Sequence, residues 1–151
     1  MKKLIATLVT GFLIAGVAFA QRADEAAPAV RFQAIDIYID SRDQPLAAYQ
    51  LEVTADRNVV KIAGIEGGEH PAFREAPYYD PRAIQRERVV IAAFKTGSAD
   101  NLPKGRTRIA TVHVQITGEA RPDFNVHLST AATLQGEKVS ATAEARERAA
   151  D

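Results

Sequence analysis

Hydrophobic and polar residues alternate along four stretches of the chain. In residues 35–40 three isoleucines are separated by aspartate or tyrosine, and the same period of two recurs over 49–54, 106–117 and 124–129. Successive side chains of a β-strand point to opposite faces of its sheet, so this period is typical of strands that bury one face. We therefore predict four half-buried strands, with Ile37 and its two neighbouring isoleucines facing inward.

Three further stretches predict strands without such clean alternation. Residues 59–65 are mostly apolar and end before a glycine pair, and residues 88–94 are apolar without interruption after Arg88. An unbroken apolar run is expected of a central strand that is covered on both faces. A tight hairpin at 134–137 introduces a last, weak strand over 139–143.

The order of these segments indicates the fold class. No segment before residue 144 shows a sustained apolar repeat of 3.6 residues. Seven or so short strands separated by turns are typical of an all-β sandwich rather than an α/β fold. The remaining residues 144–151 are charged and alanine-rich, and we expect them to form a frayed helix or a disordered tail.

The first 20 residues have the pattern of a secretory signal peptide. A basic start, Met1-Lys2-Lys3, precedes an uncharged stretch over 4–20 that ends in Ala18-Phe19-Ala20, a small-x-small cleavage site. An uncleaved membrane anchor is the alternative, but this stretch is short of the roughly 20 apolar residues that span a bilayer. We expect cleavage after Ala20, a flexible leader over 21–29, and a protein located in the periplasm or outside the cell.

The composition narrows the classes of function. Lys plus Arg and Asp plus Glu number 19 each, so net charge does not favour nucleic acid or an anionic membrane as partner. The absence of cysteine excludes disulfides, thiolate nucleophiles and Cys-ligated metal centres. The sequence has no Gly-x-Ser-x-Gly elbow and no phosphate-binding glycine loop, so we expect a protein that is not an enzyme and uses no cofactor.

The longest irregular segment, residues 66–87, is the main candidate for a functional loop, because connections beyond about 15 residues are uncommon in compact domains. Glu66, Glu69 and His70 lie at its start, and two carboxylates beside an imidazole can bind a metal or act as an acid and base pair. The alternative is a glycine turn with solvated charges, since the cluster lacks the helical histidine spacing of zinc hydrolases.

Aromatic residues supply the other candidates for partner binding. Tyr78 and Tyr79, followed by Asp80, lie in the long loop, and Tyr38 falls on an outward strand position. Exposed aromatic side chains stack on sugar rings or anchor partner proteins, although an outward tyrosine is also a common cross-strand packing residue.

Two histidines occupy outward positions of strands that we expect to be neighbours. If those strands pair, His113 and His127 come within reach of each other, as in a metal site. The alternative is chance placement of two polar residues on a solvated sheet face.

The order of segments over residues 30–143 resembles the cohesin family and, more loosely, the carbohydrate-binding-module sandwiches that share its fold. The likeness lies in the strand expected at 35–40, a small-residue, aromatic, Gln and apolar strand at 46–54, a strand after an Asp-x-x-Val turn at 59–65, a strand ending in Ala-Phe at 88–94, and a Gly, apolar, Ala, apolar strand at 105–116. The resemblance implies a jelly-roll β-sandwich without catalytic activity that docks a partner module through one sheet face; in cohesins that partner is a dockerin.

Together these patterns predict a jelly-roll-like β-sandwich of about seven to nine strands that is exported and binds a partner. The expected partner is a protein, either dockerin-like or a component of the cell envelope, or a polysaccharide, and no membrane span remains after cleavage. The alternative is a metal-binding protein or metal-dependent hydrolase that uses the 66–87 loop and a histidine of the sheet. A third interpretation is a subunit of an envelope assembly, which would expose a large apolar patch.

Overall fold

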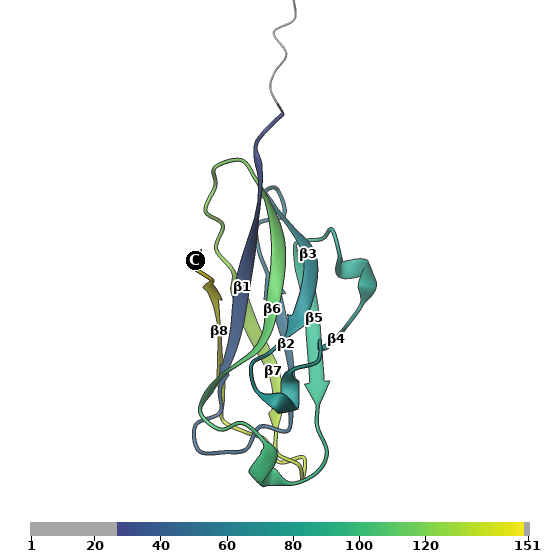
Figure 1. Ribbon diagram of the computed structural model, residues 1–151, viewed down its shortest axis with the longest axis vertical. Helices are drawn as coiled ribbons and strands as arrows, with labels where there is room; N and C mark the ends of the chain where they lie inside the picture. The colour runs from purple at the N-terminus through teal and green to yellow at the C-terminus, as the bar shows by residue number, and fades with distance from the viewer. Residues whose placement is uncertain (1–26, 150–151) are drawn as a thin grey trace, which may run out of the picture.

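Eight strands form two antiparallel sheets of four strands each in the computed structural model, which describes residues 27–149 (Figure 1). The strand order is β3-β6-β1-β8 in the first sheet and β4-β5-β2-β7 in the second. The prediction of an all-β sandwich is confirmed. The predicted signal peptide, residues 1–20, and most of the leader lie outside the described residues.

The first sheet contains the two longest strands. Its members are β1 (Val30–Asp40), β3 (Val60–Gly67), β6 (Arg106–Thr117) and β8 (Thr142–Glu147). The second sheet consists of β2 (Ala48–Thr54), β4 (Tyr78–Tyr79), β5 (Arg88–Phe94) and β7 (Asn125–Ala132). Three short 3-10 turns lie in the connections: η1 (Pro71–Phe73), η2 (Pro81–Ala83) and η3 (Ala99–Asn101).

The core lies between the two sheets and is built mainly from branched aliphatic side chains. Ile35, Ile37 and Ile39 of β1 are 0% exposed, as the alternation predicted. They belong to one cluster of buried residues that includes Leu51 of β2 and Ile91 of β5. Removal of this apolar surface from water is the dominant stabilising term, and it determines which face of each strand points inward.

The prediction that residues 88–94 are covered on both faces is wrong. Val89 and Ile91 are buried, whereas Val90 and Phe94 are 39% and 63% exposed. The reason is that no further layer covers the outer face of the second sheet among the described residues. An apolar run alone does not reveal whether a second layer exists.

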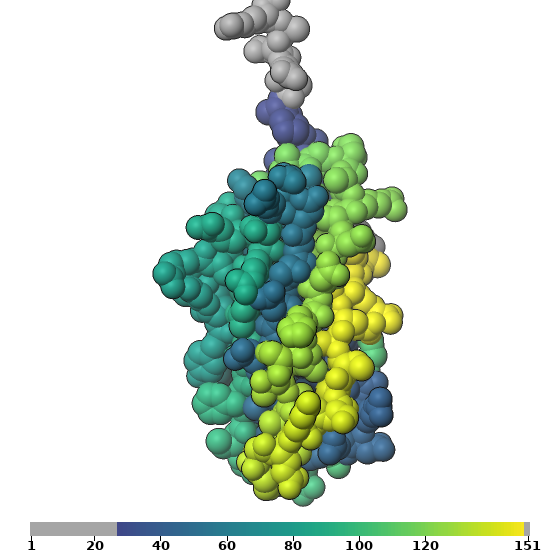
Figure 2. Space-filling view, turned by 180° about the vertical axis from the view of Figure 1, so that it is seen from behind, coloured from purple at the N-terminus to yellow at the C-terminus, as the bar shows by residue number. Residues whose placement is uncertain are grey.

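The prediction of a frayed or disordered tail from residue 144 is also wrong. Residues 142–147 form β8, which pairs antiparallel with β1 from Asp40↔Thr142 to Ile35↔Glu147. Figure 2 shows these C-terminal residues in yellow along one edge of the molecule. The sandwich therefore extends beyond residue 143, and the last strand begins three residues later than predicted. The sequence signal was weak because the inward residues of β8 are alanines.

No helix within residues 27–149 is long and apolar enough to cross a membrane.

Candidate functional site

The long 66–87 segment is packed closely against the sandwich at its start, where two glycines lie. A Cβ atom on Gly67 would come within 2.0 Å of the Arg74 carbonyl oxygen, and one on Gly68 within 2.2 Å of the Arg108 carbonyl oxygen. Only glycine permits such close approach of two backbones. The segment is thereby held against β6 from its first residues.

Two of the predicted metal or acid and base candidates have structural roles at this point. The Arg108 backbone N–H donates to Glu69 Oε1 at 2.9 Å, and the Glu69 N–H donates to the Arg108 carbonyl at 3.0 Å. The Ala72 N–H donates to His70 Nδ1 at 3.1 Å, so His70 caps η1. Both side chains satisfy backbone N–H groups that would otherwise lack partners.

Glu66 points elsewhere, toward His113 of β6, with 3.2 Å between Glu66 Oε2 and His113 Nε2. Glu66, Glu69 and His70 thus have three separate partners. Within residues 27–149 no three or more His, Cys, Asp or Glu side chains gather in a way that could hold a metal ion.

The two sheet histidines are not neighbours, so the hypothesis that they approach each other is wrong. His113 lies on β6 in the first sheet, and His127 lies on β7 in the second, opposite Glu52 of β2. Alternation assigned both side chains to outward faces correctly, but the two outward faces belong to opposite sides of the sandwich.

Tyr38 lies on the outward face of β1, as predicted, and is part of a charged network. The Arg106 guanidinium lies 3.6 Å from the centre of its ring, and Arg106 Nε donates to Glu144 of β8 at 2.7 Å. One face of the Tyr38 ring is therefore covered by an intramolecular cation–π contact.

The middle of the 66–87 segment is anchored in the core by Phe73. Its ring is buried and meets the ring of Tyr49 edge to face, with 5.2 Å between ring centres. The Tyr49 hydroxyl lies in hydrogen-bonding range of the Ile109 carbonyl, and burial raises the pKa of this hydroxyl above its ordinary value. The segment is thus a packed part of the fold that presents the residues after it in a defined position.

Those following residues form an exposed aromatic pair with β5. Tyr78 in β4 lies opposite Ala92, and its ring stacks beside that of Phe94, with 6.2 Å between ring centres and 14° between ring planes. Tyr78 is 70% exposed, whereas Tyr79 packs against the core. Val90 and Phe94 share the outward face of β5 with Ala92 because side chains on one face recur every second residue. We call Tyr78, Val90, Ala92 and Phe94 the aromatic face.

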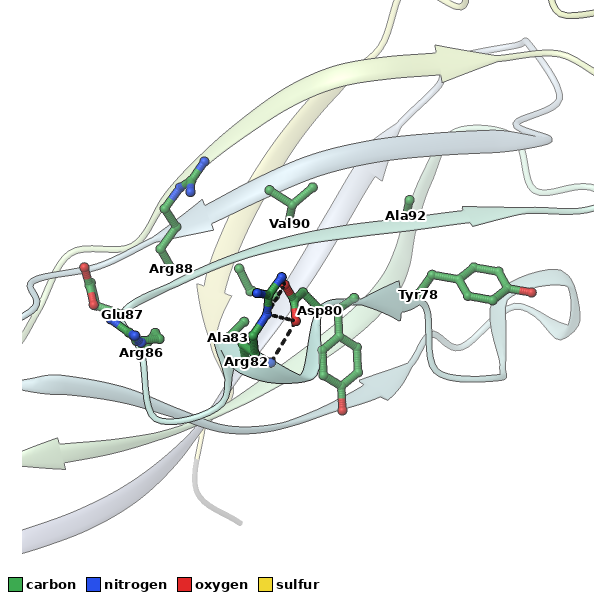
Figure 3. Close-up of a pocket in the computed structure, with 11 residues that line it drawn as sticks. Tyr78, Asp80, Arg82, Ala83, Arg86, Glu87, Arg88, Val90 and Ala92 are labelled. Atoms are coloured by element: carbon green, nitrogen blue, oxygen red, sulfur yellow. Dashed lines mark hydrogen bonds and ion pairs between the residues drawn. The ribbon is translucent and has the colours of Figure 1, made fainter.

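A groove of about 730 Å³ borders the aromatic face, between β5 and the η2 turn (Figure 3). Val90 and Ala92 point the same way from β5 in this view, and Arg82, Arg86 and Arg88 are among the residues around the groove. A second hollow of about 350 Å³ is lined by Tyr78 together with Phe94. Tyr78 therefore borders two depressions in the surface.

Three of the charged residues around the groove, Asp80, Arg82 and Arg88, form ion pairs. Asp80 begins η2 by accepting the Arg82 N–H at 2.9 Å, and its carboxylate also pairs with the Arg82 guanidinium at 2.7 Å. These hydrogen bonds from Arg82 lower the pKa of Asp80. Arg88 Nε donates to Glu52 Oε2 at 2.7 Å across β5 and β2. The apolar part of this surface is thus flanked by ion pairs, and Asp80 has a local structural role.

Sequence reasoning identified Tyr78 but missed Val90 and Phe94. Their outward position was readable from the spacing of two within 88–94, had that run been treated as a half-exposed strand.

Comparison of the chain with protein-family models, with curated proteins and with solved structures finds no match. Fold and site together define a two-sheet β-sandwich with an exposed aromatic pair.

Proposed function

We propose that the protein is an exported, non-catalytic binding module that contacts its partner through the aromatic face. The partner is a protein or an extracellular polysaccharide. Export is supported by the signal-peptide pattern of residues 1–20, and the resemblance to cohesins supports binding through a sheet face.

The observation that carries this proposal is the clustering of exposed apolar side chains. Among the described residues, five large hydrophobic side chains are exposed, and three of them, Tyr78, Val90 and Phe94, lie on the aromatic face. Single exposed apolar residues are common, but contiguous ones on a folded protein mark interaction sites. Aromatic side chains are also the most frequent anchors of such sites.

The aromatic face is held in place before any partner arrives. Tyr78 is fixed by the pairing of β4 with β5, by Tyr79 packed against the core, and by buried Phe73 earlier in the same segment. A surface that is already ordered loses little conformational entropy on binding, which favours affinity.

The experiment is a capture assay with the immobilised chain, using envelope extract, culture fluid and insoluble polysaccharides as sources of partner. Phe94→Ala and Tyr78→Ala test the aromatic face. Phe32→Ala is the matched control, because Phe32 is at least as exposed as Tyr78 and Phe94 but belongs to β1 of the other sheet. We expect one defined partner that the Phe32→Ala variant retains and that binds the Phe94→Ala variant at least about tenfold more weakly, in line with an anchor residue.

The same assay is run with a chelator, which we expect to leave binding unchanged. Equal binding by all three variants would contradict a role for the aromatic face. Loss of binding with chelator would instead favour a metal-dependent site.

A further inference from the structure

The C-terminal strand β8 is attached to the sandwich with little apolar burial. Among the described strands it pairs only with β1, and the residues opposite Ile39, Ile37 and Ile35 are Ala143, Ala145 and the exposed Glu147. Both alanines are only partly buried. Since apolar stabilisation scales with buried area, β8 gains less from the core than any strand that contributes leucine, isoleucine or valine.

Polar contacts supply most of the side-chain attachment of β8. Arg106 of β6 pairs with Glu144, with both side chains about two-fifths exposed. Arg148, just after β8, donates to Asp36 of β1 from Nε at 3.1 Å and from Nη2 at 2.6 Å, and to Thr111 at 3.0 Å. The exposed Arg106–Glu144 pair contributes little to stability and is weakened by salt. Asp36 is buried, so its hydrogen bonds with Arg148 contribute more and are the main side-chain attachment of β8.

The hydrogen-bonding pattern shows which backbone groups of β1 are paired with β8. The Arg148 N–H donates to the Ala34 carbonyl, so even-numbered residues of β1 direct their backbone groups toward β8. The Ser41 N–H donates to the carbonyl of Gly105, the residue just before β6. The odd-numbered residues of β1 therefore direct their backbone groups toward β6. Without β8, Asp36 and Tyr38 would present unpaired N–H and C=O groups at an open edge of the sheet.

A short hinge connects β8 to a firmly held residue. Val139 is buried, and its N–H donates to the Ala131 carbonyl at 2.8 Å. Only Ser140 and Ala141 separate Val139 from the first residue of β8. Among the described residues β8 is an edge strand that pairs with β1, so its detachment leaves the other strand pairings intact.

We propose that β8 detaches from β1 and that the exposed edge of β1 binds β8 of a second copy of this chain. A second copy is the occupant because its β8 carries the same alanines, Glu144 and Arg148 in the same order. It restores the contacts with Arg106 and Asp36 without any new complementarity, as in strand exchange between identical chains. This inference is independent of the proposed function, since the aromatic face lies on the other sheet.

Hydrogen exchange of single backbone amides tests the detachment. If β8 opens locally, the amides of Asp36 and Tyr38 exchange at least about 100-fold faster than those of Ile35 and Ile37, because local openings require less free energy than global unfolding. Equal protection of the even and odd residues would overturn the proposal.

A labelled peptide of residues 140–149 tests the acceptor edge, with fluorescence anisotropy as the readout. The peptide competes with the attached strand, so its apparent affinity depends on the open fraction. Arg148→Gln weakens only the attached strand, since the peptide brings its own arginine, and we expect it to tighten peptide binding about tenfold. Arg82→Gln is the matched control, because it removes an arginine–carboxylate pair remote from β8, and it should leave peptide binding unchanged.

A disulfide between Asp40→Cys and Thr142→Cys provides the opposite test. These residues are paired across β1 and β8, with a Cα spacing in the range that disulfides tolerate. The oxidised protein should not bind the peptide, and reduction should restore binding in the same molecule. The proposal would be overturned if the Arg148→Gln variant did not bind the peptide or if the oxidised protein bound it. It would also be overturned if a scrambled peptide bound equally well. The proposed function is tested separately: if the Phe94→Ala variant fails to capture the partner, the proposed function is supported whatever the peptide experiment shows.

Discussion

Arg148 and Asp36 lie 112 residues apart in the chain and form a bidentate ion pair on the outer face of the first sheet. Thr111, fully buried, donates to Asp36 Oδ1 at 2.8 Å, and the Arg108 guanidinium lies 3.9 Å from the same oxygen. This pair therefore links the C-terminal end of β8 to β1 and β6. Its consequences for stability and pH can be measured directly.

Acidification should destabilise the protein through Asp36. Burial alone raises the pKa of this carboxyl, but hydrogen bonds from Arg148 and Thr111 outweigh burial and hold the pKa below its ordinary value of 3.8. A lowered folded-state pKa contributes stability that is present above the unfolded value and is lost as pH falls through the folded value. We expect the urea concentration at the unfolding midpoint of the wild type to decrease when the pH is lowered below about 4.

Asp36→Asn is the matched variant for this effect. It should cost about 1.5–3 kcal/mol at pH 7, as for hydrogen bonds to charged groups, and its loss of stability between pH 5 and pH 3 should be smaller than that of the wild type. Parallel pH profiles of the two proteins would show that Asp36 does not carry the acid sensitivity.

Gly68→Ala should destabilise the long segment. The added Cβ would lie 2.2 Å from the Arg108 carbonyl oxygen, and backbone must move to admit it, at a cost of about 1–3 kcal/mol or more. Gly64→Ala is the control, because a Cβ there meets no atom within 4 Å. Chemical denaturation of both variants checks this, and similar midpoints would contradict the close backbone packing.

Ile37→Ala should cost about 2–5 kcal/mol, since the side chain is fully buried between the sheets. Val30→Ala in the same strand should stay within about 0.5 kcal/mol, because Val30 is exposed. Thermal or urea unfolding measures both, and an unchanged curve for Ile37→Ala would refute the inward assignment.

Mass spectrometry of the exported protein tests the N-terminal prediction. Cleavage after Ala20 leaves Gln21 as the first residue. An intact species beginning at Met1 and recovered from membranes would favour the anchor instead.

The sequence alone determined the strands that bury one face and many of the residues that form the core. Alternation over 35–40 predicted that Ile35, Ile37 and Ile39 point inward, and all three are fully buried. This works because the period of two is a property of the strand itself, and because burial of apolar area selects one of only two faces.

Tertiary structure alone decided which strands lie together and what covers their outer faces. It placed His113 and His127 on opposite sides of the sandwich and left Phe94 exposed beside Tyr78. It also made residues 142–147 a strand, through pairing with β1. Strand order and the covering of outer faces depend on contacts between residues far apart in the chain, and no local pattern of apolar and polar residues records them.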